Sequence, residues 1–403
     1  MYPALLDEFK PRSTGVFSGD RATAADLQHY SSIATCIRSL LPVAALGIPI
    51  VDRAVFSLLT LYYGRLHGDA SLVEFARSTY TVALGQYSRR LENSFAKNDT
   101  VANQVQYQIF MCTSIALQFF EHLNEVQMMG PGHQAHVEGA LQALKSCGPQ
   151  TLQKSPGMRM AFSGLRGVAV FVAIEQRAPS FLAGPEWLHL TSKNSDQSMR
   201  DRLNEIGLEI PALLESADEL SSGAENGTSS QSIDSGLQLL LKVSDLKRKL
   251  EQWLYLLRTS TSVPLYWPRG LPVTHTEASD FECSRKYDNK FHQLNFANGP
   301  IAGLLAHCWS LKLELLVTSI EVHQLLLGDR DKRPDLLPVP EILPHDLERD
   351  RLEADETARL ILEAEPYLAS CFEGVLCLQS PLRIVARYFE RLESGGSAKG
   401  TIG

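Results

Sequence analysis

Two histidines spaced three residues apart, His133 and His136, are the first residues whose types and spacing could do chemistry. On a helix they would share one face, as two ligands of a metal or a proton-transfer pair would. Zinc would need a third protein ligand, and the neighbouring sequence offers none, so we predict no metal site. Near a helix N-terminus the positive end of the dipole favours the neutral imidazole, which suits a base more than an acid. Both residues are therefore candidate catalytic residues, with packing or helix capping as the alternative.

Further candidates are ionisable or aromatic residues within or beside strongly apolar segments. A buried ionisable group requires a partner or a function, and irregular packing of many helices often encloses an apolar pocket with few polar groups. We therefore predict an interhelical pocket that accepts an apolar or aromatic small molecule. For the tryptophan among these residues, the alternative is a role as a core anchor. The candidate pocket residues are His122, Arg177, His307, Trp309 and His323.

No motif for a cofactor or a nucleophile accompanies these residues. The chain contains no Gly-x-Ser-x-Gly elbow, no P-loop and no Gly-x-Gly-x-x-Gly phrase after a strand. Arg285 and Lys286 could activate the thiol of Cys283, but a solvated loop with a free cysteine explains the same stretch. We predict no cofactor, and the sequence names no nucleophile–base pair.

Composition and charge restrict the class of protein. With 403 residues, 44% of them hydrophobic and 21% charged, the chain can bury a large core. Its net charge of -8 disfavours autonomous binding to nucleic acid. Seven scattered cysteines indicate reduced thiols in an intracellular protein. The N-terminus has no signal-peptide pattern, and the apolar run at 40–51 is too short to span a bilayer, so we expect no membrane association.

The elements that must position the candidate residues are expected to be helices. Apolar residues recur at three- and four-residue steps, for instance throughout 69–123, and no stretch shows convincing strand alternation. We therefore predict an all-α fold, a large irregular helical array. A segment rich in serine, glycine and acidic residues, 216–236, predicts a flexible loop. It would separate an N-terminal helical half, 1–215, from a C-terminal half, 237–403, with the two halves packed into one composite domain.

The C-terminal half opens with an amphipathic helix whose apolar residues follow alternating four- and three-residue steps. This pattern is a short heptad seam. Packing inside the domain is its expected use, and a dimer interface is the alternative. The seam residues are Leu239, Val243, Leu246, Leu250, Trp253 and Leu257.

The phrase RAPSFLAGPEW at 177–187 follows an apolar helix and is expected to end it. Pro179 biases the residue before it away from helical geometry. Phe181, Leu182 and Trp187 are then expected to hold the exiting chain on the core.

Four segments together resemble the regulatory (middle-homology) domain of fungal zinc-binuclear-cluster transcription factors: 69–123, 136–149, 177–187 and 367–392. In that family a His-x-x-Gly-Ala core runs into a Gly-Pro, and a later helix ends in an Arg-x-Pro-Ser-Phe-Leu phrase followed by a tryptophan. A Pro-Leu then precedes an aromatic-bearing helix near the end. The matching residues are His136, Gly139, Ala140, Gly148, Pro149, Arg177, Pro179, Ser180, Phe181, Leu182, Trp187, Pro381, Leu382, Tyr388 and Phe389.

The resemblance implies the helical fold of that domain and a transcription-regulator-like function through a protein partner or a small apolar ligand. The family's six-cysteine zinc cluster, which reads DNA, has no counterpart in this sequence, so we expect no direct nucleic-acid binding by this chain. The alternative is an enzyme of fungal natural-product biosynthesis that catalyses a cyclisation or isomerisation in an interhelical pocket, where positioning leaves no motif. We expect a nuclear location for the regulator and a cytoplasmic one for the enzyme, and a homodimer is a further alternative.

Overall fold

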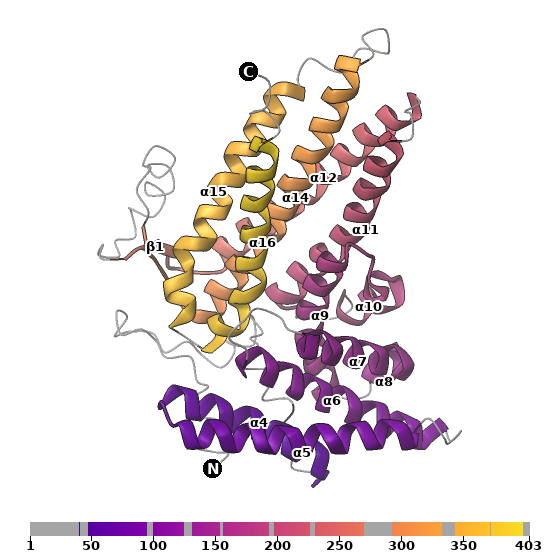
Figure 1. Ribbon diagram of the computed structural model, residues 1–403, viewed down its shortest axis with the longest axis vertical. Coiled ribbons are helices and arrows are strands. Elements are labelled where there is room, and N and C mark those ends of the chain that lie inside the picture. Colours follow the sequence, from indigo (N-terminus) through magenta and orange to yellow (C-terminus); the bar gives the residue numbers. More distant parts are fainter. Residues whose placement is uncertain are drawn as a thin grey trace. The chain divides into compact units, whose positions relative to one another are not determined.

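The computed structural model describes residues 40, 47–94, 100–124, 131–153, 156–192, 197–225, 230–269, 292–332, 343–370 and 372–397. These residues form an all-α structure of packed helices with one short pair of strands (Figure 1). The predicted all-α class is therefore confirmed. The stretch that contains Cys283, Arg285 and Lys286 lies outside the described residues.

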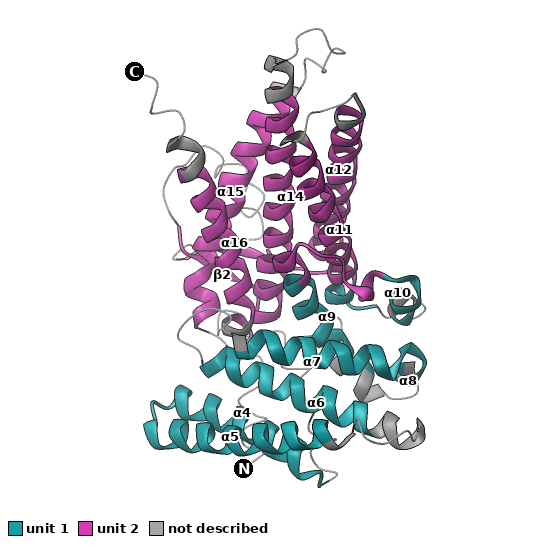
Figure 2. Ribbon diagram, turned by 45° about the vertical axis from the view of Figure 1, so that its right-hand side comes forward, with its two compact units in different colours: residues 1–172, 184–201 teal, residues 173–183, 202–403 magenta. Residues whose placement is uncertain are grey.

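The chain divides by its internal contacts into two compact units (Figure 2). Unit 1 comprises residues 1–172 and 184–201, and unit 2 comprises residues 173–183 and 202–403. The described helices of unit 1 are α4 (Pro49–Leu66), α5 (Ala70–Ser94), α6 (Thr100–Asn124), α7 (Pro131–Cys147), α8 (Pro149–Gln153), most of α9 (Pro156–Gln176) and α10 (Pro185–Ser192). Unit 2 contains η1 (Phe181–Ala183), most of α11 (Met199–Glu225), α12 (Ser230–Thr259), β1 (Tyr266–Pro268), β2 (Leu294–Phe296), α14 (Gly299–Lys332), α15 (Leu343–Ala369) and α16 (Phe372–Ser397).

In unit 1, α4 and α5 form a closely packed helical hairpin. Asp69 caps α5, because its Oδ1 accepts the backbone N–H groups of Ser71 at 2.9 Å and Leu72 at 3.0 Å. Gly64 on α4 allows the close approach, since a Cβ at this position would lie only 3.0 Å from the backbone nitrogen of Val73. α6 packs against α4 and α7, so the helices that carry the N-terminal candidate histidines are fixed by this arrangement.

Glycine and proline end α7. Gly148 follows the last residue of the helix with a φ of 76°, in the left-handed region, and its N–H donates to the carbonyl of Leu144 at 3.1 Å. Pro149 then begins α8, where its missing N–H costs no hydrogen bond.

The RAPSFLAGPEW phrase ends α9, as predicted from Pro179. Arg177 has a φ of 48°, and the N–H of Ala178 donates to the carbonyl of Ala173 at 3.1 Å. Leu182, in η1, is fully buried. Trp187, on α10, is also buried and its ring lies 6.1 Å from that of Phe162.

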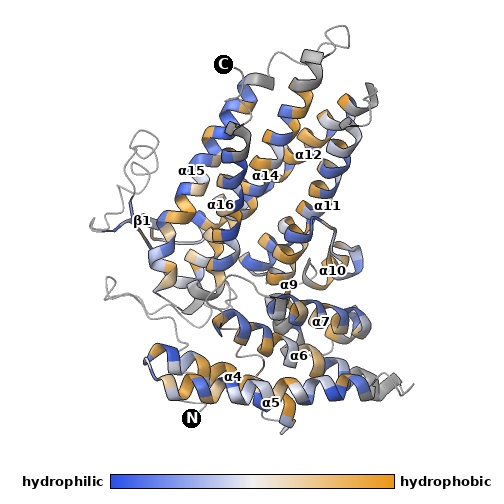
Figure 3. Cartoon of the chain, viewed as in Figure 1, coloured by the Kyte–Doolittle hydropathy of each residue, from blue (hydrophilic) through white to orange (hydrophobic). Residues whose placement is uncertain are grey.

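In unit 2, α14 is the central helix. It packs against α12, α15 and α16. Hydrophobic residues are gathered along α14, whereas hydrophilic residues are frequent on α15 and α16 (Figure 3). All six predicted seam residues of α12 are buried within the protein, so this seam is used for internal packing and is not open to a second copy.

A two-stranded antiparallel sheet, which the sequence did not predict, packs on α14 and α15. β1 and β2 pair with Tyr266 opposite Phe296 and Pro268 opposite Leu294. Each strand has three residues, which is too short to show the alternation that marks a strand in sequence. Only the tertiary fold brings the two strands together.

The structure differs from the predicted flexible loop at 216–236. α11 continues to Glu225 and α12 begins at Ser230, so the described residues of this stretch are helical, while 226–229 lie outside the described part. Both sides of the stretch belong to unit 2, so the division between the compact units does not coincide with it.

Contacts with other parts of the chain accompany the helical conformation of this serine-rich stretch, and its serine hydroxyls are bonded within the helix. The hydroxyls of Ser216, Ser221 and Ser222 each donate to the backbone carbonyl four residues earlier, at 2.9 Å. Ala217 is buried, and Asp218 forms an ion pair with Arg177. Composition alone predicted a loop because the burial of Ala217 and the partner of Asp218 depend on residues that are distant in sequence.

By length and composition, the described residues include one helical segment that could cross a membrane, Gly299–Leu327 of α14. However, 94% of its most apolar window is buried inside the protein. The central position of α14 among its neighbours accounts for its apolar composition.

Candidate functional site

The three candidate histidines of the N-terminal half lie on two packed helices of unit 1. His122 is on α6, and His133 and His136 are on α7. All three are buried, and the ring centroids of His122 and His133 lie 5.5 Å apart. The structure therefore places the two candidate catalytic histidines and the candidate pocket residue His122 on the same pair of packed helices.

Three helices contribute to a hydrogen-bonded chain that ends at His136. The Tyr80 hydroxyl on α5 donates to Oε1 of Glu121 on α6. The same hydroxyl oxygen lies 3.1 Å from Nε2 of His136 on α7. The Tyr80 ring stacks on Phe120, with centroids 4.3 Å apart and planes 9° apart. We call these three polar residues the Glu121–Tyr80–His136 chain.

Burial sets the charge of the imidazole in this chain. It lowers the pKa of His136 from 6.5 to about 4, because the charged form is poorly solvated there. His136 is therefore neutral at pH 7, as expected for a base or a hydrogen-bond acceptor and not for an acid.

Contacts at the junction of α6 and α7 fix the position of Glu121. A Cβ added at Gly132, in the first turn of α7, would lie 3.0 Å from Oε1 of Glu121, so the carboxyl group packs directly on that turn. At the end of α6, Arg77 donates to the side-chain oxygen of Asn124 at 3.0 Å, and Arg65 donates to its backbone carbonyl at 2.9 Å. The chain of polar groups is thus held by α4, α5, α6 and α7.

In unit 2, Trp309 lies in an aromatic cluster formed by α14, α15 and the strand pair. Its ring meets Tyr266 edge-on at 5.5 Å and Phe296 at 6.3 Å, and Phe296 in turn meets Tyr367 at 5.0 Å. Trp309 and nearby His307 are buried. These contacts give Trp309 the role of a core anchor.

Arg177 is engaged by carboxylates of unit 2. Its Nε lies 2.6 Å from Oδ2 of Asp218 on α11. Although burial lowers the pKa of Arg177, the hydrogen bond and charge of Asp218, with Glu321 and Glu314, raise it above its ordinary value. Glu314 also pairs with Arg387 on α16, and burial raises the pKa of this carboxyl group. The guanidinium at the end of α9 therefore connects α9 and α11 within unit 2.

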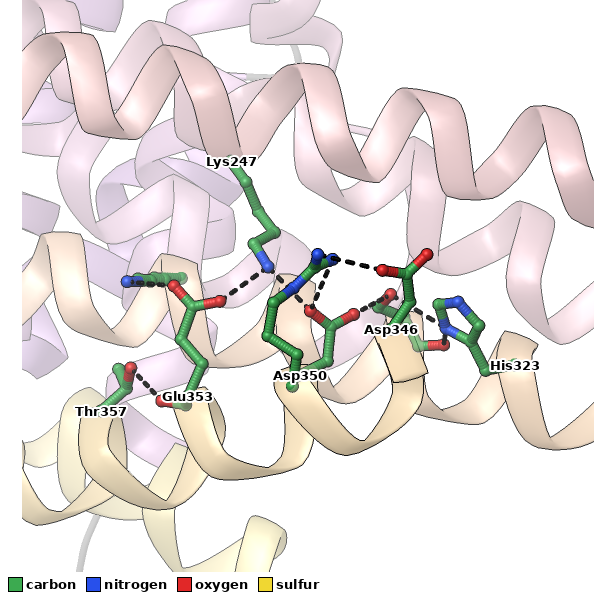
Figure 4. Close-up of polar contacts among 9 residues, drawn as sticks. Lys247, His323, Asp346, Asp350, Glu353 and Thr357 are labelled. Carbon is green, nitrogen blue, oxygen red and sulfur yellow. Dashed lines mark hydrogen bonds and ion pairs between the residues drawn. The ribbon is translucent and has the colours of Figure 1, made fainter. Parts of the chain in front are cut away.

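His323 belongs to a polar network that joins α12, α14 and α15 (Figure 4). Lys247 Nζ lies 2.9 Å from Oδ1 of Asp350 and 2.8 Å from Oε2 of Glu353. Ser319 donates to Oδ2 of Asp350 at 2.6 Å. Nδ1 of His323 lies 2.7 Å from the carbonyl oxygen of Ser319 and therefore donates to it. We call this set the Lys247 network.

The Lys247 network contains serine, histidine and aspartate, but not in the geometry of a nucleophile and its base. The Ser319 hydroxyl donates directly to Asp350, whereas His323 uses Nδ1 to bond its own helix. Ser319 is also buried. The network therefore fixes α12 on α14 and α15 and has no activated nucleophile.

Metal and thiol chemistry find little support in the described residues. There, no group of three or more histidine, cysteine, aspartate or glutamate side chains could hold a metal ion. Burial raises the pKa of Cys112 and of Cys308 to about 12, so neither thiol is a nucleophile at neutral pH.

The predicted pocket residues do not form one group. His122 belongs to unit 1, whereas Arg177, His307, Trp309 and His323 belong to unit 2. His323 lies fourteen residues after Trp309 on α14, which corresponds to about 21 Å along the helix axis. Trp309 and His323 therefore take part in separate clusters.

The partners of these histidines were not predicted from the sequence. Tyr80 falls on the apolar face of its helix, which predicts a packing role, yet its hydroxyl joins Glu121 to His136. A tyrosine on a buried face usually requires a hydrogen-bond partner, and this signal is present in the sequence. Lys247 gives no such signal, because its partners Asp350 and Glu353 are 103 and 106 residues away in sequence.

Comparison with known proteins adds no further constraint. No protein-family model matches the chain, and neither a curated protein nor a solved structure matches it.

Proposed function

We propose that the chain is a transcription-regulator-like helical domain that acts by binding a protein partner or a small apolar ligand, without binding DNA itself. The all-α architecture is compatible with the regulatory domain that the sequence resembles. The net charge of -8 supports action through a partner and not through DNA phosphates. A regulator of this kind would act in the nucleus.

The observation that carries this proposal is the position of the residues shared with that family. Gly148 and Arg177 occupy the left-handed turns that end α7 and α9. Leu182 and Trp187 are buried just after the second of these turns. His136 is buried and bonded to Tyr80. The shared residues therefore define helix ends and core contacts, which is what a common helical scaffold for binding requires.

The chemistry of the described residues supports binding more than catalysis. The buried thiols are protonated, Ser319 bonds directly to a carboxylate, and Arg177 is paired. One observation favours the alternative, an enzyme that catalyses a cyclisation or isomerisation: the Glu121–Tyr80–His136 chain could orient a single base. Such an enzyme would act in the cytoplasm.

A reporter experiment tests the regulator proposal. The full chain is fused to an unrelated DNA-binding domain, and expression of a reporter that carries the matching operator is measured in fungal cells. We expect a change in expression relative to the DNA-binding domain alone. A fusion with Leu305→Asp is the control, because a charge at this fully buried position should unfold the domain. Equal expression from the wild-type fusion and the control would contradict the proposal.

Mass spectrometry of the purified protein separates the two functions. A regulator should release a co-purifying small molecule unchanged in mass. An enzyme should convert the released molecule, or a precursor from the same cells, to an isomer with a different retention time. Conversion by the wild-type protein but not by His136→Phe would favour the enzyme.

A further inference from the structure

The hydrogen bonds in the Glu121–Tyr80–His136 chain determine which nitrogen of the His136 imidazole carries a proton. The Tyr80 hydroxyl has one hydrogen, and that hydrogen is donated to Glu121. The oxygen of Tyr80 can therefore only accept a hydrogen bond from Nε2 of His136, 3.1 Å away. The imidazole thus carries its hydrogen on Nε2.

The other nitrogen of His136, Nδ1, is then an acceptor. The pKa of about 4 keeps a second proton off the ring at neutral pH. Within the described part of the chain, the contacts of His136 are those with Tyr80, and none involves Nδ1. His136 retains 7% of its surface. Nδ1 of His136 is not among the fully buried polar atoms that lack a partner, so it lies at the exposed part of the side chain, where a ligand can donate a hydrogen bond to it.

We propose that Nδ1 of His136 binds the hydroxyl group of a neutral, apolar molecule such as a phenol or an enol, and that Tyr80 and Glu121 are positioning residues that fix the imidazole tautomer. This inference rests on the small-ligand form of the proposed function and names the ligand class and the residue that recognises it.

The surroundings of His136 account for the selectivity. An acceptor nitrogen selects a ligand with an O–H and rejects one that presents only a carbonyl or an ether oxygen at the same place. Val137 and Ala140 on α7 are fully buried, and Phe120 stacks on Tyr80. Apolar neighbours of this kind disfavour a charged ligand, so the hydroxyl group must belong to a neutral molecule.

Two probes that differ in one hydrogen-bond donor test the inference. 2-Naphthol and 2-methoxynaphthalene are titrated separately into the purified full chain at neutral pH, and binding is followed by the fluorescence of the probe. We expect 2-naphthol to bind about fivefold more tightly, which is the difference that one hydrogen bond typically supplies. Equal affinities, or no binding of 2-naphthol, would overturn the inference.

Variants assign the difference to His136. His136→Phe should remove the preference for 2-naphthol, whereas His345→Phe, at an exposed position on α15, should retain it. Circular dichroism establishes that each variant is folded. If His136→Phe does not fold, Tyr80→Phe takes its place. It should reduce the preference, because the ring is no longer held as the Nε2–H tautomer.

A spectroscopic measurement on the wild-type protein addresses the tautomer directly. Long-range ¹H–¹⁵N correlation spectra of the histidine rings should show His136 with its proton on Nε2, and Tyr80→Phe should change this pattern. A proton on Nδ1 in the wild type would overturn the inference. Failure here would leave the reporter result intact, whereas failure of the reporter experiment would remove the proposed function itself.

Discussion

Replacing Lys247 by methionine should destabilise the protein by removing one charge from a buried network. Methionine keeps an unbranched apolar side chain of similar length, so packing changes little. The Asp350 side chain is only 4% exposed and would lose its bond to the ammonium group at 2.9 Å. It would keep the Ser319 hydroxyl and Arg349, whose guanidinium lies 3.9 Å away and is largely exposed.

The expected loss of unfolding free energy follows from this geometry. Removing one partner of a fully buried ion pair costs about 3–5 kcal/mol. The remaining hydrogen bond from Ser319 lowers this cost, and Glu353 keeps its bond to Lys312 at 2.5 Å. We therefore expect Lys247→Met to lower the free energy of unfolding by about 2–3 kcal/mol.

Lys249 provides a matched control on the same helix. Its Nζ bonds Glu209 at 2.8 Å, but the two side chains are 33% and 48% exposed. Exposed pairs contribute about 0–1 kcal/mol, so Lys249→Met should lower stability by less than about 1 kcal/mol. The two variants remove the same charge and differ in the burial of their partners.

Urea denaturation followed by far-ultraviolet circular dichroism measures both variants. Asp350→Asn in the Lys247→Met background should restore part of the lost stability, because it removes the unpaired buried charge. A loss for Lys247→Met no larger than that for Lys249→Met would refute the reasoning. A double variant no more stable than Lys247→Met alone would refute it as well.

Three further predictions concern pH, thiols and backbone conformation. Because the folded pKa of His136 lies near 4 and the unfolded one near 6.5, the unfolded state binds the extra proton first. Stability should therefore fall by about 3 kcal/mol as pH decreases from above 6.5 to 4, and His136→Gln should flatten this dependence in denaturation curves. Cys112 and Cys308 should resist alkylation by iodoacetamide in the folded protein and react once it is unfolded. Mass spectrometry of proteolytic digests detects the modification, and rapid alkylation of either thiol in the native state would contradict its burial. Gly148→Ala should lower the free energy of unfolding by about 1–2 kcal/mol, because φ is positive at this position. Gly85→Ala, at a position in α5 with free space for a Cβ, should raise it by up to about 1 kcal/mol. Melting temperatures that shift in the same direction for both variants would refute this contrast.

Much of the local structure could be predicted from the sequence because its causes are local. The Gly148-Pro149 stop and the end of α9 before Pro179 follow from backbone restrictions on single residues. The all-α class followed from apolar residues at three- and four-residue steps, a period that a helix imposes directly. The buried seam of α12 followed from the same rule.

The candidate site could be predicted only in part. The sequence named His122, His133 and His136, since ionisable residues among apolar neighbours stand out. It did not name Tyr80 and Glu121, because their hydrogen bonds join residues that are far apart in sequence. Tyr80 is 41 residues from Glu121 and 56 residues from His136, and the three residues lie on three different helices. It also grouped Trp309 with His323, although the helix places them in different clusters.

The sequence by itself determined the all-α class and the ends of α7 and α9, since periodicity, glycine and proline act within a few residues. Only the tertiary structure decided which polar side chains meet. The serine-rich stretch at 216–236 shows the difference, because its composition favoured a loop, whereas Ala217 and Asp218 find partners on neighbouring elements and the described residues stay helical. Lys247 and Asp350 show the same difference for two residues that are 103 positions apart in sequence. The attraction within a buried ion pair offsets the cost of desolvation only in the low-dielectric interior and with the two groups well oriented, and both conditions exist only after the chain has folded.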